Sequence, residues 1–177
     1  MNIKNVAVLV GLLVISCTFS AAQREPSAKA VERIQKEVRH ELVKLPYLGV
    51  FDNLTYKVDG YNVTLGGQVT RPSLKSDSER AVKNIEGVET VNNQIEVLPT
   101  SPMDDRLRLR LYQAIYGYAP LQKYAMPVIK PIRIIVKSGH VSLEGVVDNE
   151  GDKNIAGIRA NSVSGIFSVK NNLVVVK

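Results

Sequence analysis

The stretch "YNVTLGGQV" (Tyr61–Val69) returns as "GHVSLEGVV" (Gly139–Val147), displaced by 78 residues. The same displacement aligns glycines, valines and one asparagine without a gap: Gly67 on Gly145, Gly87 on Gly165, Val58 on Val136, Val91 on Val169, Asn93 on Asn171 and Val97 on Val175. Chance rarely aligns so many residues at one displacement. An internal repeat of this length indicates two copies of one small domain.

The first copy predicts the element order α-β-β-α-β. Residues 30–42 form an amphipathic helix, because Val31, Ile34, Val38 and Leu42 recur at helical spacing. Residues 54–69 alternate around Asp59-Gly60, which is typical of a hairpin. Residues 76–87 begin with a capping box and end at a glycine, as helices do. Residues 88–98 supply the third strand.

The second copy predicts the same order from residue 104 to residue 177. Its first helix spans residues 104–118, with Asp104 and Asp105 as the cap. Asp148 caps its second helix, and Gly165 ends it. The first domain therefore covers residues 28–98 and the second covers residues 104–177. Residues 99–103, which contain two prolines, form the linker.

Two copies with a "V-T/S-L-x-G-x-V" strand pair, a helix and a "G-V/I-x-x-V-x-N" turn resemble the BON family. The glycines that mark the family fall at Gly67, Gly87, Gly145 and Gly165. The resemblance implies an α+β fold in which each domain packs two helices on a three-stranded mixed sheet. It also implies an envelope location, phospholipid binding and no enzyme activity.

Gly67 and Gly145 interrupt strands, where glycine is unfavourable unless a bulge or a close backbone approach requires it. We interpret both as structural positions over which a helix packs tightly, and not as parts of a ligand loop.

The N-terminus predicts export. One cation precedes the apolar run "VAVLVGLLVIS", and "SAA" precedes Gln23, which favours a signal peptide of residues 1–22. Alternatively, "VISC" (Val14–Cys17) resembles a bacterial lipobox, in which the signal ends before a lipidated Cys17. Either way we expect a periplasmic or envelope location, lipid-anchored in the second case, and no nucleic-acid partner.

Residues that carry chemistry are sparse. The two histidines, His40 and His140, lack metal-ligand spacing, so we expect no metal site. Cys17 is the only cysteine, and no serine lies in a nucleophile elbow. We therefore expect no catalytic residues, no cofactor and no enzyme activity.

Charge separates the two copies. Residues 28–99 hold ten cations and ten anions, whereas residues 103–177 hold eleven cations and six anions. The whole excess of the folded part lies in the second copy, which indicates that the copies have different tasks.

The first helix of the second copy, with the sequence "RLRLRLYQAIYGY" at residues 106–118, predicts two apolar faces. At 100° per residue, the core face gathers Leu107, Leu111, Ala114, Ile115 and Tyr118. A second face gathers Leu109, Tyr112 and Tyr116, bordered by Arg108 on one side and by Arg106 and Arg110 on the other.

Arginine, tyrosine and leucine on one helix face favour contact with an anionic phospholipid surface. The six lipid- or partner-binding candidates are Arg106, Arg108, Leu109, Arg110, Tyr112 and Tyr116. We expect a non-enzymatic protein that supports envelope integrity or tolerance of osmotic and other stress. Alternatively, the second face packs on the first domain or on another envelope protein, and the chain is an interaction module of an envelope or secretion assembly. The oligomeric state stays open.

Overall fold

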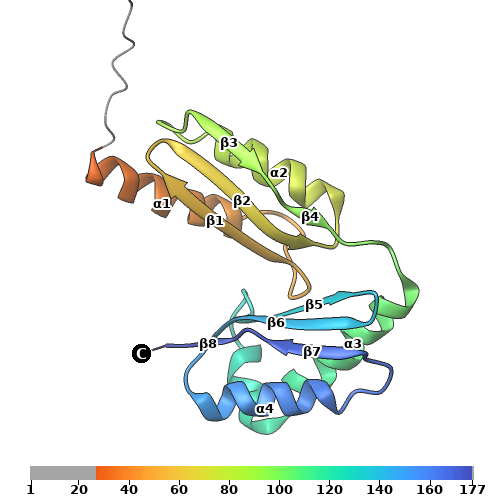
Figure 1. Cartoon of the computed structure of the whole chain (residues 1–177). Coiled ribbons are helices and arrows are strands. Elements are labelled where there is room, and N and C mark those ends of the chain that lie inside the picture. The colour runs from red at the N-terminus through yellow and green to blue at the C-terminus, as the bar shows by residue number, and fades with distance from the viewer. Residues whose placement is uncertain (1–26, 177) are drawn as a thin grey trace, which may run out of the picture.

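A computed structural model describes residues 27–176, so the predicted signal peptide of residues 1–22 and Cys17 lie outside the described residues. The described residues form two domains with helices and strands interleaved, the expected α+β fold (Figure 1). The first domain consists of α1 (Ala28–Val43), β1 (Asn53–Asp59), β2 (Asn62–Val69), α2 (Pro72–Lys83), β3 (Thr90–Asn93) and β4 (Glu96–Val97). The second consists of α3 (Pro102–Tyr116), the 3₁₀ helix η1 (Ala119–Ala125), β5 (Ile132–Lys137), β6 (His140–Val147), α4 (Glu150–Asn161), β7 (Ser168–Asn171) and β8 (Val174–Val175).

Each domain has a mixed sheet with three strand positions. β1 pairs antiparallel with β2 through a turn at Gly60, and β3 and β4 both pair parallel with β2. β3 and β4 are two pieces of one strand position, separated by Gln94 and Ile95. The second domain repeats this arrangement with β5 to β8. The predicted three-stranded mixed sheet is confirmed, and the central strand position is β2 or β6.

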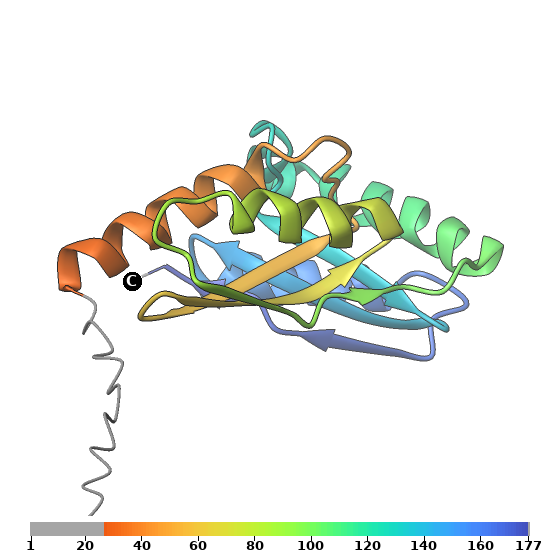
Figure 2. The same ribbon diagram turned by 90° about the horizontal axis from the view of Figure 1, so that it is seen from above.

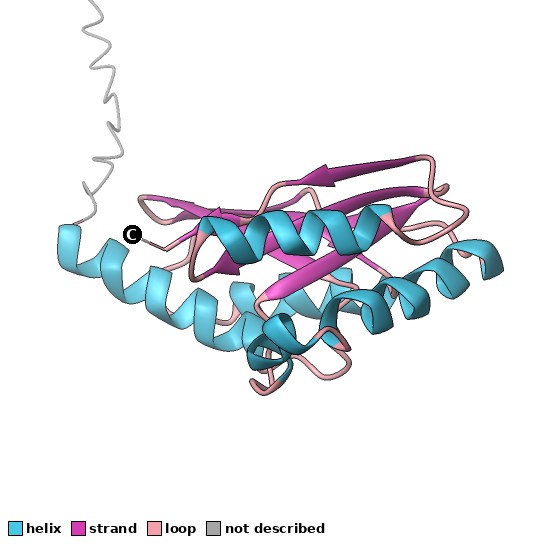
Figure 3. Ribbon diagram, turned by 90° about the horizontal axis from the view of Figure 1, so that it is seen from below, coloured by secondary structure: helices cyan, strands magenta, loops and turns pink. Residues whose placement is uncertain are grey.

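Two helices cover one side of each sheet, and Figure 2 shows those of the first domain in front of its strands. In the first domain, Ile34, Val38 and Leu42 of α1 pack with Val63, Leu65 and Leu74. In the second domain, Leu107, Leu111 and Ile115 of α3 pack with β5, β6 and α4. Seen from below, helices lie in front of the strands of the second domain (Figure 3). Its helix-free side faces the first domain (Figure 1).

The displacement of 78 residues holds in the structure. It carries β2 onto β6, α2 onto α4, β3 onto β7 and β4 onto β8, with the same bounds in each case. The first helices follow a different displacement, because the buried residues Ile34, Val38 and Leu42 correspond to Leu107, Leu111 and Ile115, which lie 73 positions later. Five extra residues therefore lie between α3 and β5, in the connection that contains η1.

Several helix ends differ from the prediction. α2 begins at Pro72 and not at Ser76, since proline suits the first helical position. The cap of α4 is Asn149, whose side chain accepts the amide of Asp152, so the choice of Asp148 is wrong by one residue. α2 and α4 end four residues before Gly87 and Gly165, and these two glycines adopt φ of 87° in the turns that follow. α3 begins at Pro102, inside the expected linker.

The strand glycines permit a close backbone approach, but not to a helix as expected. Gly67 has φ of 95°, and a Cβ there would lie 1.9 Å from the carbonyl oxygen of Asn53. Gly145 has φ of 112°, and its Cβ would lie 2.0 Å from the carbonyl oxygen of Pro131. Both neighbours lie on or beside the adjacent strand. Glycine is required because the strand bends against its own sheet partner.

The repeated asparagines pin the last strand to the second helix. Asn93 Nδ2 donates to the carbonyl of Lys75, and Asn171 Nδ2 donates to the carbonyl of Lys153. Each Oδ1 also accepts an amide two residues further along. The sequence comparison aligned these asparagines but gave them no role. Their contacts show that the repeat preserves a polar clamp as well as a core.

Candidate functional site

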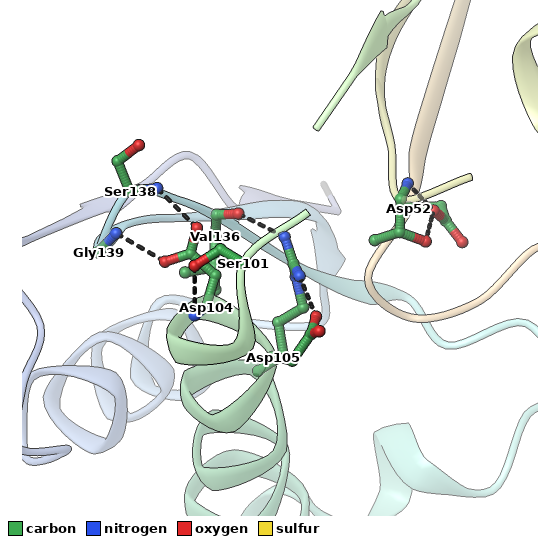
Figure 4. Close-up of polar contacts among 9 residues, drawn as sticks. Asp52, Ser101, Asp104, Asp105, Val136, Ser138 and Gly139 are labelled. Carbon is green, nitrogen blue, oxygen red and sulfur yellow. Dashed lines mark hydrogen bonds and ion pairs between the residues drawn. The ribbon is translucent and has the colours of Figure 1, made fainter. Parts of the chain in front are cut away.

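α3, the element that carries all six predicted binding residues, is anchored at its start. Ser101 caps the helix by accepting the amide of Asp104 at 3.2 Å. Asp104 is buried, and its carboxylate accepts the amides of Ser138 at 2.8 Å and Gly139 at 2.9 Å (Figure 4). Asp104 thus ties α3 to the turn between β5 and β6. The expectation that it caps the helix is wrong, because Ser101 does so.

Arg108 and Tyr116 do not lie on an outer face, contrary to the prediction, because both are buried at 4% exposure. The Nη2 atom of Arg108 donates to the carbonyl of Val136 at 2.7 Å, and the hydroxyl of Tyr116 donates to the carbonyl of Ile132 at 2.5 Å. Both carbonyls belong to β5, whose one sheet partner among the described residues is β6. α3 therefore packs along the outer edge of β5, and these side chains satisfy its backbone oxygens.

Tyr112 is partly buried at the contact between the domains. Its ring lies 4.9 Å from that of Tyr116 and meets Phe51 of the first domain edge-on at 6.5 Å. Arg108, Tyr112 and Tyr116 are spaced four residues apart, so they form one stripe along α3. This stripe faces the edge of β5 and the first domain. The alternative reading of the second face, packing on the first domain, is correct for Tyr112.

The remaining three candidates stay accessible. Arg106 and Arg110 are exposed, and Leu109 is 60% exposed. Met103, half-exposed at 50%, lies in the same helical rows, and its sulfur contacts Arg106. We call Met103, Arg106, Leu109 and Arg110 the α3 outer face. Tyr118, expected in the core, instead lies beyond the end of α3 at 38% exposure.

Phe167, which the sequence interpretation did not single out, lies next to this end of the domain. It is 75% exposed, its ring packs on Gly139, and its amide donates to the Gly139 carbonyl at 2.9 Å. Since Gly139 is also bound to Asp104, Phe167 lies close to the first turn of α3.

A polar cluster at the start of α4 joins Lys123, Tyr124, Asp148 and Asp152. The hydroxyl of Tyr124 donates to Asp152 at 2.6 Å and accepts the amide of Asp148 at 2.8 Å. Lys123 Nζ lies 2.7 Å from the carboxylates of both Asp148 and Asp152. These carboxylates raise the pKa of Lys123, and the hydrogen bond from Lys123 is the main reason that the pKa of Asp152 is lowered. Both groups are held in their charged forms, which suits a structural clamp and not a proton-transfer site.

Within residues 27–176, no group of histidine, cysteine and carboxylate side chains is arranged to hold a metal ion. No helix in the same range is long and apolar enough to cross a membrane. The two histidines, His40 and His140, lie in different domains. His140 Nδ1 hydrogen-bonds the Ser168 hydroxyl at 2.8 Å, and His40 is exposed on α1.

A comparison with known families matches the BON domain to residues 30–99 and 121–177. The chain belongs to the BON family. The tandem arrangement of BON domains predicted from the repeat is thereby confirmed, and the family is associated with phospholipid binding and with envelope proteins. The second match begins after α3, whose displacement of 73 residues departs from that of the rest of the domain. The family match to the second copy thus leaves out the helix that carries the candidate residues.

Solved structures give only a distant likeness. One match is described as CdsD, a structural protein of the Type III secretion system of Chlamydia trachomatis, at 14% identity and a TM-score of 0.29, covering 81% of this chain and 92% of the other. The C-terminal domain of the same protein matches at 15% identity and a TM-score of 0.30, covering 80% and 96%. These scores carry no argument about function. A comparison with curated proteins finds no match.

Proposed function

We propose that this BON protein is a non-enzymatic envelope protein that binds anionic phospholipid surfaces through the α3 outer face. The observation that carries the proposal is the exposure of Leu109 beside Arg106, with Arg110 exposed on the other side of Arg106. These residues lie in the second domain, where residues 103–177 hold eleven cations and six anions. Support of envelope integrity and stress tolerance is the physiological role that we infer.

The two exposed arginines and the apolar side chains contribute in different ways. Each cation near an anionic membrane contributes about 1 kcal/mol, so the pair gives about 2 kcal/mol, or roughly thirtyfold in affinity. Leu109 and Met103 add apolar area that enters the headgroup layer. Such attachment is reversible, as expected of a helix that lies on a membrane and does not cross it.

The buried stripe of α3 supports this function without touching lipid. Arg108 and Tyr116 bind the edge of β5, and Asp104 binds the next turn, so the helix is fixed along its length. A fixed helix presents its outer face without an ordering cost at the moment of binding. We therefore assign binding to Arg106, Leu109 and Arg110, and positioning of the helix to Arg108, Tyr112 and Tyr116.

Co-sedimentation with vesicles of phosphatidylglycerol and phosphatidylcholine tests the proposal. We expect the double variant Arg106→Glu with Arg110→Glu to bind at least thirtyfold more weakly than the parent. The matched control is Lys29→Glu with Lys36→Glu, which changes the net charge equally but on exposed positions of α1. If both double variants lose binding equally, only net charge matters and the assignment to α3 is wrong. If neither loses binding, the lipid surface lies elsewhere.

Salt separates the charged part from the apolar part of binding. We expect parent binding to weaken as salt is raised, because exposed charges are screened. Leu109→Ser should weaken binding at low and high salt alike. The predicted envelope location is tested separately by the intact mass of the mature protein, which differs between cleavage after Ala22 and lipidation of Cys17.

A second function, docking to another envelope protein, is favoured by one observation. The Phe51–Tyr112 contact shows that the neighbourhood of α3 already serves as a docking surface for a protein domain. Two results together would favour this second function over lipid binding. The parent would not bind anionic vesicles, and envelope extract would protect the new cysteine of a Leu109→Cys variant from thiol labelling.

A further inference from the structure

The two domains meet through the ion pair between Lys137 and Glu96 and through a loop that lies in a groove. The docking loop, which we define as Gly49, Val50 and Phe51, precedes β1 and lies against β5. The carbonyl of Val50 accepts the amide of Ile134 at 2.9 Å, and that of Gly49 accepts Arg133 Nη1 at 2.8 Å. The loop thereby occupies the groove between the first helix and the first strand of the second domain.

The 78-residue displacement gives each half of this contact a counterpart elsewhere in the chain. Gly49, Val50 and Phe51 correspond to Pro127, Val128 and Ile129, which precede β5 as the docking loop precedes β1. Ile134, which receives the loop, corresponds to Tyr56 of β1. The chain thus contains two loops and two grooves, of which it uses one pair internally.

The second loop, which we define as residues 126–129, is exposed although it is apolar. Val128 is 97% exposed, Met126 is 84% exposed and Ile129 is 41% exposed. By contrast, Val50 and Phe51 are partly buried against the core of the second domain. Apolar side chains gathered at such exposure mark an interaction surface. At 97% exposure, Val128 is not seated in the groove of its own molecule.

The second groove is open. Ile132, Ile134 and Val136 of β5 are fully buried, whereas their counterparts Leu54, Tyr56 and Val58 of β1 are only partly buried. Between α1 and β1 lies a cavity of about 320 Å³. It is lined by Arg133 of the second domain and by seven residues of the first, which are Arg39, Leu42, Val43, Leu48, Asn53, Leu54 and Tyr56. Among the described residues, the backbone amide of Tyr56 donates to no carbonyl outside the sheet.

The first helices explain why only one groove is filled. At the displacement of 73, the stripe Arg108, Tyr112 and Tyr116 corresponds to Gln35, Arg39 and Val43. Tyr112 meets the docking loop and Tyr116 binds β5, whereas Val43 has no hydroxyl that could bind the edge of β1. The groove of the first domain is left with an apolar floor at Leu54 and Val43 and with a free strand edge, which suits an apolar loop.

We propose that residues 126–129 of one molecule occupy the groove between α1 and β1 of a second copy of this chain. The contact repeats between molecules the loop-in-groove contact that the chain already makes between its domains. The loop and the groove are different surfaces, and both border a pocket that Val43, Val128 and Ile129 line. Two copies therefore either exchange loops reciprocally in a dimer or join head to tail in a ring or an open chain.

Sedimentation velocity of the purified protein over a range of concentrations, without lipid, tests the proposal. We expect the average mass of the parent to rise with concentration from that of a monomer to that of a dimer or a larger assembly. The loop variant, Val128→Asp with Ile129→Asp, and the groove variant, Val43→Asp, should each stay monomeric over the same range. Val174→Asp is the matched control, because Val174 is an exposed valine on β8, at 62% exposure, and it should assemble like the parent.

Mixing the two variants gives the sharpest result. The loop variant keeps its groove and the groove variant keeps its loop, so the mixture should form a one-to-one dimer and nothing larger. A parent that stays monomeric at every concentration overturns the proposal, as does a loop variant that assembles like the parent. Circular dichroism checks that each variant folds, and the Arg106→Glu, Arg110→Glu protein should assemble normally, so failure here and failure of lipid binding are distinguishable.

Discussion

Tyr116→Phe separates a structural role for this tyrosine from a role in lipid contact. The substitution keeps the buried ring and removes only the hydroxyl that donates to the Ile132 carbonyl. A buried acceptor left without its partner costs about 1 to 3 kcal/mol of stability. For a protein of this size, the melting temperature should fall by about 2 to 4 °C for each kcal/mol lost.

Urea unfolding followed by circular dichroism measures the loss, and Tyr118→Phe is the control. Tyr118 lies two residues further along and is exposed, so its substitution should change stability by less than about 0.5 kcal/mol. Both variants should bind vesicles like the parent. Equal stability of Tyr116→Phe and the parent would refute the inference that this hydroxyl satisfies the edge of β5.

Alkaline pH gives an independent measure of the same contact. Burial raises the pKa of Tyr116 above its ordinary value of about 10. The neutral phenol is thus favoured by folding, and its contribution is complete below pH 10 and is lost as the pH rises further. The parent should lose up to about 1.4 kcal/mol per pH unit above pH 10 more than Tyr116→Phe does. Parallel pH profiles for the two proteins would show that the phenol is not buried.

Three further predictions test the clamps of the fold. Gly145→Ala should destabilise the protein by more than about 3 kcal/mol, because it combines a positive φ with overlap on the Pro131 carbonyl; its urea midpoint should lie well below the parent's. Asn171→Ala should cost about 1 to 3 kcal/mol, since it removes one of the hydrogen bonds to the Lys153 carbonyl and leaves the Leu173 amide without its side-chain acceptor, and hydrogen exchange of β8 should accelerate. Asp152→Asn should destabilise the protein more at pH 7 than at pH 3, because the lowered pKa of Asp152 gives stability above its unfolded value of about 4 that is lost as the pH falls; identical urea midpoint differences at both pH values would contradict this.

The fold was predictable because the repeat compares the chain with itself. The local pattern was ambiguous at "RLRLRL" (residues 106–111), which alternates like a strand. The repeat placed this segment in a helix, because it corresponds to the predicted first helix of the first copy. Helix ends were less predictable, because Ser76 and Asp148 satisfy the pattern of a cap as well as the true ends do. The wrong contact assigned to Gly67 has a similar cause, since a glycine signals a close approach without naming the neighbour.

The candidate site was half predictable. A helical wheel assumes that a helix buries one face, whereas α3 packs against two surfaces, the inner face of the sheet and the outer edge of β5. Arg108 and Tyr116 are buried because that edge has carbonyl groups to satisfy, a demand that no pattern within α3 reveals. The spacing of Arg108, Tyr112 and Tyr116 was the available signal, because one stripe of long polar-tipped side chains suits a polar strand edge.

The packing of α3 along the edge of β5 also affects the tendency of the chain to aggregate before it is folded. Residues 132–136, "IRIIV", combine high β-propensity, four apolar side chains and one charge, the composition of a segment that stacks with copies of itself into fibrils. α3 is made before β5, so the covering helix is already present when this strand emerges from synthesis. Substitutions at Arg108 or Tyr116 therefore weaken the protection of β5 against aggregation. They should lower the yield of soluble protein by more than the loss of folded-state stability predicts.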